Sequence, residues 1–258
     1  MEKIPEIILG LDVSTKTIGI CLYMTGNGLN DGKIIELTHV APKTPKNIKG
    51  IEALFLKKDI FENEFLLKYK DTDIKKIIIE QPLLRSNNVN TIADLLRFNS
   101  LIAESCYRIL NIIPQFISSY DARKYSYPEL MGIRYLDKKG VPYDNKKIMK
   151  DIKDSKLTLF SDFKWDIDKK QIMWGLVNEN YNNIVWLYNK KGDLKQENFD
   201  AVDSLVCILG WLHKEQTSTE NDFKIIDYVL YKNENNIDEY VKYTFTSPVG
   251  NITKKITF

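Results

Sequence analysis

Three apolar, β-branched runs lie close together at the start of the chain, and they constrain its fold more than any other feature. They occupy residues 6–13, 17–24 and 33–40, and each is long enough to form one strand of a sheet. The second connection contains Gly26-Asn27-Gly28 and Asp31-Gly32, which are typical of tight turns. Because short connections join antiparallel neighbours, we predict a three-stranded antiparallel meander.

After residue 40, helical and strand-like patterns alternate, which predicts a parallel extension of the same sheet. Ser247-Pro248-Val249-Gly250-Asn251 is expected to turn a hairpin near the end of the chain. The expected helices lie at residues 46–69, 91–110, from about 145, 169–180 and 198–213, and the expected strands at 75–80, 112–118, 223–231 and 240–258. The fold class predicted is therefore α/β with a mixed sheet.

Bulk properties place the chain among globular proteins, with 43% apolar and 28% charged residues in a length of 258. A net charge of +2 does not by itself identify a nucleic-acid-binding protein. Cys21, Cys106 and Cys207 lie among apolar neighbours without a CxxC pair, which favours buried thiols in a reducing compartment. Residues 1–5 lack a signal-peptide core, and no run reaches membrane-spanning length. We expect a cytoplasmic protein, in the host cytoplasm if viral, with no membrane partner.

Four acidic side chains occupy positions where a carboxylate needs an explanation. Asp12 interrupts an otherwise apolar strand, and Glu80 ends another. Asp200 and Asp203 are three residues apart near the start of an apolar helix, so they share one helical face. An ionised carboxylate that is buried without a partner costs several kcal/mol. A cation is therefore one candidate partner for these groups.

Each acid also has an ordinary structural interpretation. Asp12 can be hydrogen-bonded to a following turn, and Glu80 can mark the point where its strand reaches solvent. Asp200 and Asp203 can complement the helix dipole. If the first and fourth strands are neighbours, however, Asp12 and Glu80 converge at the carboxyl ends of the strands. Converging carboxylates suit Mg²⁺, and two such ions roughly 4 Å apart can catalyse phosphodiester cleavage.

The order of these motifs resembles the RuvC-type Holliday-junction resolvases of the RNase H-like nuclease superfamily. The matching residues are Gly10-Leu11-Asp12-Val13-Ser14 with Gly19, then Ile79-Glu80-Gln81-Pro82, then Asp200-Ala201-Val202-Asp203-Ser204. The resemblance implies an RNase H-like mixed sheet, with three antiparallel strands and then parallel strands, flanked by helices. The nuclease domain would span residues 1–214 with a helical insertion at about 125–196. A β-rich extension would follow at 215–258.

The resemblance further implies a structure-selective DNA endonuclease that acts as a homodimer on four-way junctions or other branched DNA. Asp12, Glu80, Asp200 and Asp203 would be both the catalytic residues and the ligands of two Mg²⁺ ions, for which Mn²⁺ can substitute. Hydrolysis would leave a 5′-phosphate and a 3′-hydroxyl.

Basic residues near the scissile phosphate are also implied by the resemblance, although solvated surface is the ordinary interpretation of each. The candidate DNA contacts are Lys16, Leu83, Leu84, Arg85, Arg123, Lys124, Lys146 and Lys147. Family members often carry an aromatic residue shortly after the strand-end glutamate. Leu83 and Leu84 stand there in this chain and leave only an aliphatic wedge. Gly19 is expected to permit close backbone approach beside the metal site.

Three other functions stay open. The chain can be a nuclease for flap DNA or RNA–DNA hybrids, an actin-like or sugar-kinase-type ATPase, or a protein that binds branched DNA without cutting it. The ATPase folds require a second phosphate-binding Asp-Gly loop and a Gly-rich adenosine site, and the sequence after Glu80 contains neither. A binding protein has no need of four acids, because carboxylates without metal repel DNA phosphates.

Overall fold

The computed structural model describes residues 4–27, 31–82, 89–127, 169–182, 184–216, 224–232, 239–247 and 250–257. The chain divides into two compact units. The first combines Met1–Ser126 with Lys170–Glu215, and the second combines Tyr127–Lys169 with Gln216–Phe258.

A five-stranded mixed sheet with the order β3-β2-β1-β4-β5 forms the centre of the first unit. Its strands are β1 (Ile7–Val13), β2 (Ile18–Met24), β3 (Lys33–Val40), β4 (Ile74–Glu80) and β5 (Gln115–Ile117). The first three pair antiparallel, whereas β4 and β5 extend the sheet in parallel beyond β1. This order confirms both the predicted meander and its parallel extension. It is the RNase H-like arrangement.

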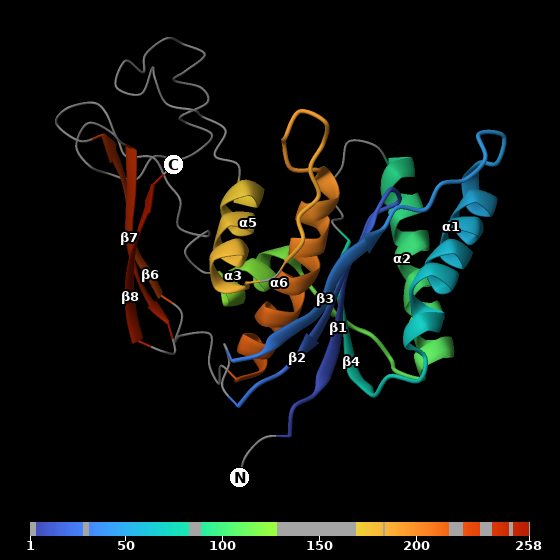
Figure 1. Cartoon of the computed structure of the whole chain (residues 1–258), viewed down its shortest axis with the longest axis horizontal. Helices are drawn as coiled ribbons and strands as arrows, with labels where there is room; N and C mark the ends of the chain where they lie inside the picture. Colours follow the sequence, from blue (N-terminus) through green and yellow to red (C-terminus); the bar gives the residue numbers. More distant parts are fainter. Residues whose placement is uncertain are drawn as a thin grey trace. The chain divides into compact units, whose positions relative to one another are not determined.

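Helices cover both faces of this sheet, with α1 and α2 on one side and α3, α5 and α6 on the other (Figure 1). Their bounds are α1 (Gly50–Glu64), α2 (Val89–Leu110), α3 (Ser119–Ser126), α5 (Lys169–Asn180) and α6 (Gln196–Gln216), with a 3₁₀ turn, η1, at Leu66–Tyr69. The helix predicted from residue 46 begins only at Gly50, which has a φ of +59°. The sequence patterns did not predict α3.

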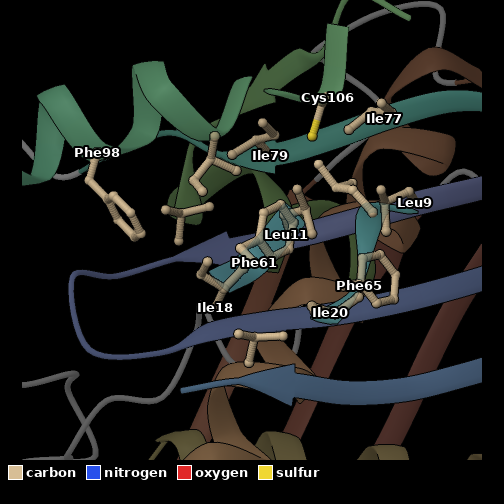
Figure 2. Close-up of a cluster of buried hydrophobic side chains, with 14 of the residues drawn as sticks. Leu9, Leu11, Ile18, Ile20, Phe61, Phe65, Ile77, Ile79, Phe98 and Cys106 are labelled. Carbon is tan, nitrogen blue, oxygen red and sulfur yellow. The ribbon is translucent and has the colours of Figure 1, made fainter. Parts of the chain in front are cut away.

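One cluster of buried hydrophobic side chains lies between the sheet and the pair α1 and α2, and α6 buries further apolar side chains such as Val202 and Leu205. Figure 2 shows Leu9 and Leu11 of β1 packed together with helix side chains such as Phe61 and Phe98. Because side chains alternate along a strand, Asp12, which follows Leu11, lies on the opposite face. That face carries α6, so the alternation of β1 presents its one carboxylate to this helix.

The second unit contains a three-stranded antiparallel sheet with the order β6-β7-β8. Its strands are β6 (Lys224–Lys232), β7 (Glu239–Ser247) and β8 (Gly250–Thr257). Ser247 pairs with Gly250, which confirms the hairpin predicted at this position. The predicted strand at 240–258 is therefore two strands.

The cysteines and the hydrophobicity of the helices are the two remaining features about which the sequence makes a prediction. Cys21, Cys106 and Cys207 are buried free thiols, as predicted. Among the described residues, no helix has the length and apolar character needed to cross a membrane.

Candidate metal centre

Asp12 and Glu80 lie at the same end of two adjacent strands. Leu11 of β1 and Ile79 of β4 are partners in parallel register, and each is followed directly by one of the two acids. The first and fourth strands are therefore neighbours, which is the arrangement required for Asp12 and Glu80 to converge. Both carboxylates belong to the C-terminal edge of the parallel strands, where open α/β sheets bind their ligands.

The first turns of α6 bring two further acids to this edge. Carboxylate oxygens of Asp12, Asp200 and Asp203 all lie within 4.8 Å of one another. The side chains of Asp200 and Asp203 are only 13% and 4% exposed. Glu80 is not part of this group of three, as far as the described residues show. The structure thus brings three of the four predicted acids into direct proximity and places the fourth on the adjacent strand end.

Two glycines explain how α6 comes so close to the sheet. Gly19 of β2 is the partner of Asp12 across the ladder, and a Cβ atom built on it would overlap the backbone carbonyl group of Asp200. A Cβ atom on Gly10 of β1 would overlap the backbone oxygen of Ser204. Strand and helix backbones are therefore in direct contact, which confirms the close approach predicted at Gly19.

Gly19→Ala is expected to destabilise the fold by about 1 to 3 kcal/mol, because the added methyl group meets rigid backbone. Urea denaturation followed by circular dichroism measures this change. Gly175→Ala is a matched control, since a Cβ atom at this position on α5 meets nothing within 4 Å. That substitution is expected to stabilise the helix by roughly 0.5 to 1 kcal/mol. Equal stability of the Gly19 variant and wild type would contradict the close contact.

Burial and mutual repulsion disfavour the charged forms of these acids. Burial raises the pKa of Asp12 well above its usual value, and the charges of Glu80, Asp203 and Asp200 raise it further. Burial, with the charge of Asp203, raises the pKa of Glu80 to about 7. Burial also raises the pKa of Asp200, against the opposing effect of Lys170. Additional positive charge therefore favours the ionised forms of Asp12, Glu80 and Asp200.

Two basic side chains supply part of that charge. The Lys170 ammonium lies 2.9 Å from Oδ2 of Asp203 and 3.7 Å from Oδ1 of Asp200. The Arg123 guanidinium donates to Oδ1 of Asp203 at 3.4 Å. Gln196 also donates a hydrogen bond to Oδ1 of Asp200 at 3.4 Å. Among the described residues, no basic side chain forms an ion pair with Asp12, although the charge of Lys170 lowers its pKa.

The donor set fits a hard divalent cation. The converging ligand atoms are carboxylate oxygens, which Mg²⁺ and Mn²⁺ prefer to nitrogen or sulfur donors. Burial raises the pKa values of Asp12 and Glu80, because the apolar surroundings do not solvate the ionised carboxylates. Asp12, Asp200 and Asp203 would hold such an ion, and Glu80 is placed to contribute from the adjacent strand.

Comparison with known proteins gives similarity in structure alone. No protein-family model and no curated protein matches the sequence. Thermus thermophilus RuvC in complex with a Holliday junction substrate has a TM-score of 0.47 at 4% identity, covering 83% of this chain and 97% of that one. A second Thermus thermophilus RuvC structure has a TM-score of 0.45 at 8% identity, covering 81% and 96%. An Aquifex aeolicus member of the Ppx/GppA family has a TM-score of 0.35 at 6% identity, covering 99% and 51%.

These TM-scores are too low to support an argument about function. The assignment of the fold depends instead on the strand order and pairing of this chain.

The candidate DNA contacts have different positions. Arg123 lies at the acidic group, whereas the Lys124 ammonium lies 5.2 Å from the centre of the Tyr125 ring. Lys16 is exposed in the turn after β1, where its backbone N–H donates to the Ser14 hydroxyl. The remaining candidates lie outside the described residues, and they are Leu83, Leu84, Arg85, Lys146 and Lys147.

Sequence reasoning missed Lys170, although it predicted the helix that carries this residue. The available signal was electrostatic. Lys169 and Lys170 begin α5, where the helix dipole is unfavourable for cations. Such a placement requires compensation, and Asp200 and Asp203 supply it.

Proposed function

We propose that this chain is a divalent-metal-dependent endonuclease that cuts branched DNA, with the four-way junction as its preferred substrate. The observation that carries the proposal is the convergence of Asp12, Asp200 and Asp203 at the C-terminal edge of an RNase H-like sheet. The motif order described above supports the choice of substrate class. Hydrolysis needs no side-chain nucleophile when metal ions activate the attacking water.

In this proposal, the carboxylates of Asp12, Asp200 and Asp203, completed by Glu80, hold two Mg²⁺ ions. When bound there, such ions would supply activation of the attacking water and charge stabilisation of the leaving oxygen. The residues of the chain fix the position of the scissile phosphate relative to this centre. Lys170 and Arg123 place positive charge next to Asp203, where a DNA phosphate also requires neutralisation. The products would carry a 5′-phosphate and a 3′-hydroxyl.

We further infer that the active form is a homodimer, because a junction with two-fold symmetry is cut symmetrically by a two-fold protein. Residues 1–214 would form the nuclease domain, and residues 215–258 a β-rich extension. Light scattering of the purified chain, with and without junction DNA, measures the number of copies in each complex.

A nuclease assay across matched substrates tests the proposed activity. The purified chain is incubated with Mg²⁺ and end-labelled four-way junction, flap, RNA–DNA hybrid or linear duplex of the same sequence. We expect paired nicks in the junction, 5′-phosphate ends, and no cleavage in EDTA. ATP hydrolysis without DNA is measured in parallel.

Preferential cutting of flaps or hybrids would contradict the junction assignment but retain the metal-dependent nuclease. Binding without cleavage in Mg²⁺ or Mn²⁺ would contradict the enzymatic proposal. Robust ATP hydrolysis would favour the ATPase alternative.

A further inference from the structure

The segment between α5 and α6 folds into a small hairpin that has no part in the hydrophobic core or the acidic group. Residues 184–195 extend beyond the N-terminal end of α6 as the orange loop in Figure 1. Tyr188 and Leu194 form an antiparallel bridge at its base. The Asn189 side-chain oxygen accepts the backbone N–H of Asp193 at 3.0 Å, and its amide donates to the Asp193 carboxylate at 3.0 Å. The turn is therefore closed by its own hydrogen bonds.

Side-chain contacts tie this hairpin to the helices on both sides. The buried Asn198 side chain donates to the Leu187 carbonyl at 2.7 Å and accepts the Leu187 N–H at 2.9 Å. Asn198 stands two residues before Asp200, so this pair of hydrogen bonds, the Asn198 clamp, fixes the hairpin to the start of α6 near Asp200. On the other side, Trp186 meets Trp174 of α5 edge to face, with 5.7 Å between ring centres.

The surface of this hairpin combines cations with exposed apolar groups. Lys190, Lys191 and Lys195 are exposed. Val185 is 86% exposed and Tyr188 is 52% exposed, although both lie on a segment with internal order. Packing within the protein does not account for the exposure of the Tyr188 ring, because the segment that carries it is held in place by hydrogen bonds. Exposed lysines on the same short segment as an exposed aromatic ring match a nucleic acid, which offers phosphates to the cations and base faces to the ring.

We propose that the hairpin of residues 184–195 is a DNA-binding arm beside the metal centre. Lys190 and Lys191 contact backbone phosphates, and Tyr188 stacks on a base that is unpaired in branched DNA. The clamp at Asn198 keeps these contacts at a fixed distance from Asp200. This inference rests on the proposed nuclease function and assigns part of its DNA-binding surface.

Binding of a four-way junction at several salt concentrations, with Ca²⁺ in place of Mg²⁺ to prevent turnover, tests the arm. The double variant Lys190→Ala/Lys191→Ala is expected to bind about 10-fold more weakly, and its slope of log affinity against log salt is expected to fall by about 2. Lys70→Ala/Lys75→Ala is the matched control. Both of its lysines are exposed and lie near the start of β4, at the opposite end of this strand from Glu80. This control is expected to match wild type.

The stacking contact is tested with two further variants. Tyr188→Ala is expected to weaken junction binding about 5-fold or more, because stacking of a base on an aromatic ring contributes roughly 1 to 3 kcal/mol. Tyr188→Phe is expected to retain wild-type affinity, since the ring is kept. Thermal melting of every variant checks that the fold is unchanged.

Wild-type affinity and salt slope in the lysine double variant would overturn the arm while leaving the nuclease proposal intact. Equal loss in the Lys70/Lys75 control would also overturn it, because the effect would then reflect overall charge. Failure of the wild-type chain to bind or cleave any DNA substrate would overturn both proposals.

Discussion

Asp12→Asn is expected to reduce Mg²⁺-dependent cleavage by roughly 1000-fold or more, because a lost metal ligand removes several kcal/mol of transition-state stabilisation. DNA binding is expected to be unchanged or tighter, since one negative charge next to the phosphates disappears. The metal-free variant is also expected to be more stable than wild type. Burial and three neighbouring carboxylates raise the pKa of Asp12, so its ionisation opposes folding.

Single-turnover cleavage, equilibrium binding and thermal melting in EDTA measure these three effects. Asp73→Asn is the matched control, because its side chain is 78% exposed and it precedes β4, at the opposite end of this strand from Glu80. Glu80→Gln is expected to follow Asp12→Asn in all three measurements. Full activity of either variant would remove that residue from the mechanism. Loss of binding together with a lower melting temperature would indicate misfolding instead.

Metal removal is expected to make stability depend strongly on pH. Glu80 has a pKa of about 7 in the folded chain, against 4.5 for an unperturbed glutamate. Between these values the folded state holds a proton that the unfolded state has released, so stability falls as the pH rises. The loss is roughly 3 kcal/mol and is complete above pH 7. Asp12 acts in the same direction, since its pKa is also raised.

Saturating Mg²⁺ is expected to reverse this trend. An ion present at 100 times its dissociation constant adds about 2.7 kcal/mol of stability, and its binding strengthens as its ligands lose their protons. Urea denaturation from pH 4.5 to 8, in EDTA and in Mg²⁺, measures both effects. Glu80→Gln is the internal control and is expected to make the EDTA curve less steep, because the contribution of Asp12 remains. Identical dependence of stability on pH in wild type and Glu80→Gln, with no effect of Mg²⁺, would contradict a cluster of buried carboxylates with raised pKa values.

Local patterns were sufficient to predict the sheet and the location of the acids. Successive side chains of a strand point to opposite faces, so Asp12 lies on the face of β1 opposite to that of Leu9 and Leu11. The spacing of Asp200 and Asp203 likewise places both on one helical face. Gly19 was the one residue whose type alone indicated close contact between helix and strand.

Long-range side-chain contacts were not predictable in the same way. The ion pairs of Lys170 and Arg123 with Asp203 join positions that are 33 and 80 residues apart, and no local periodicity encodes them. The position of the Glu80 carboxylate outside the group of three aspartates depends on the conformation of its side chain at the end of β4, which the sequence pattern does not specify. The two hydrogen bonds between the Asn198 side chain and the Leu187 backbone are a similar case. The sequence does not indicate which backbone groups a buried asparagine will bind, because those groups come together only in the folded chain.

Anomalous diffraction from crystals soaked in Mn²⁺ tests the central claim most directly, because it locates the ions themselves. We expect anomalous peaks between the carboxylates of Asp12, Asp200 and Asp203, with a second ion toward Glu80, and none in crystals of Asp203→Asn treated in the same way. A wild-type crystal soaked in Mn²⁺ that shows these carboxylates in contact only with Lys170 and Arg123, and no peak among them, would contradict the metal centre.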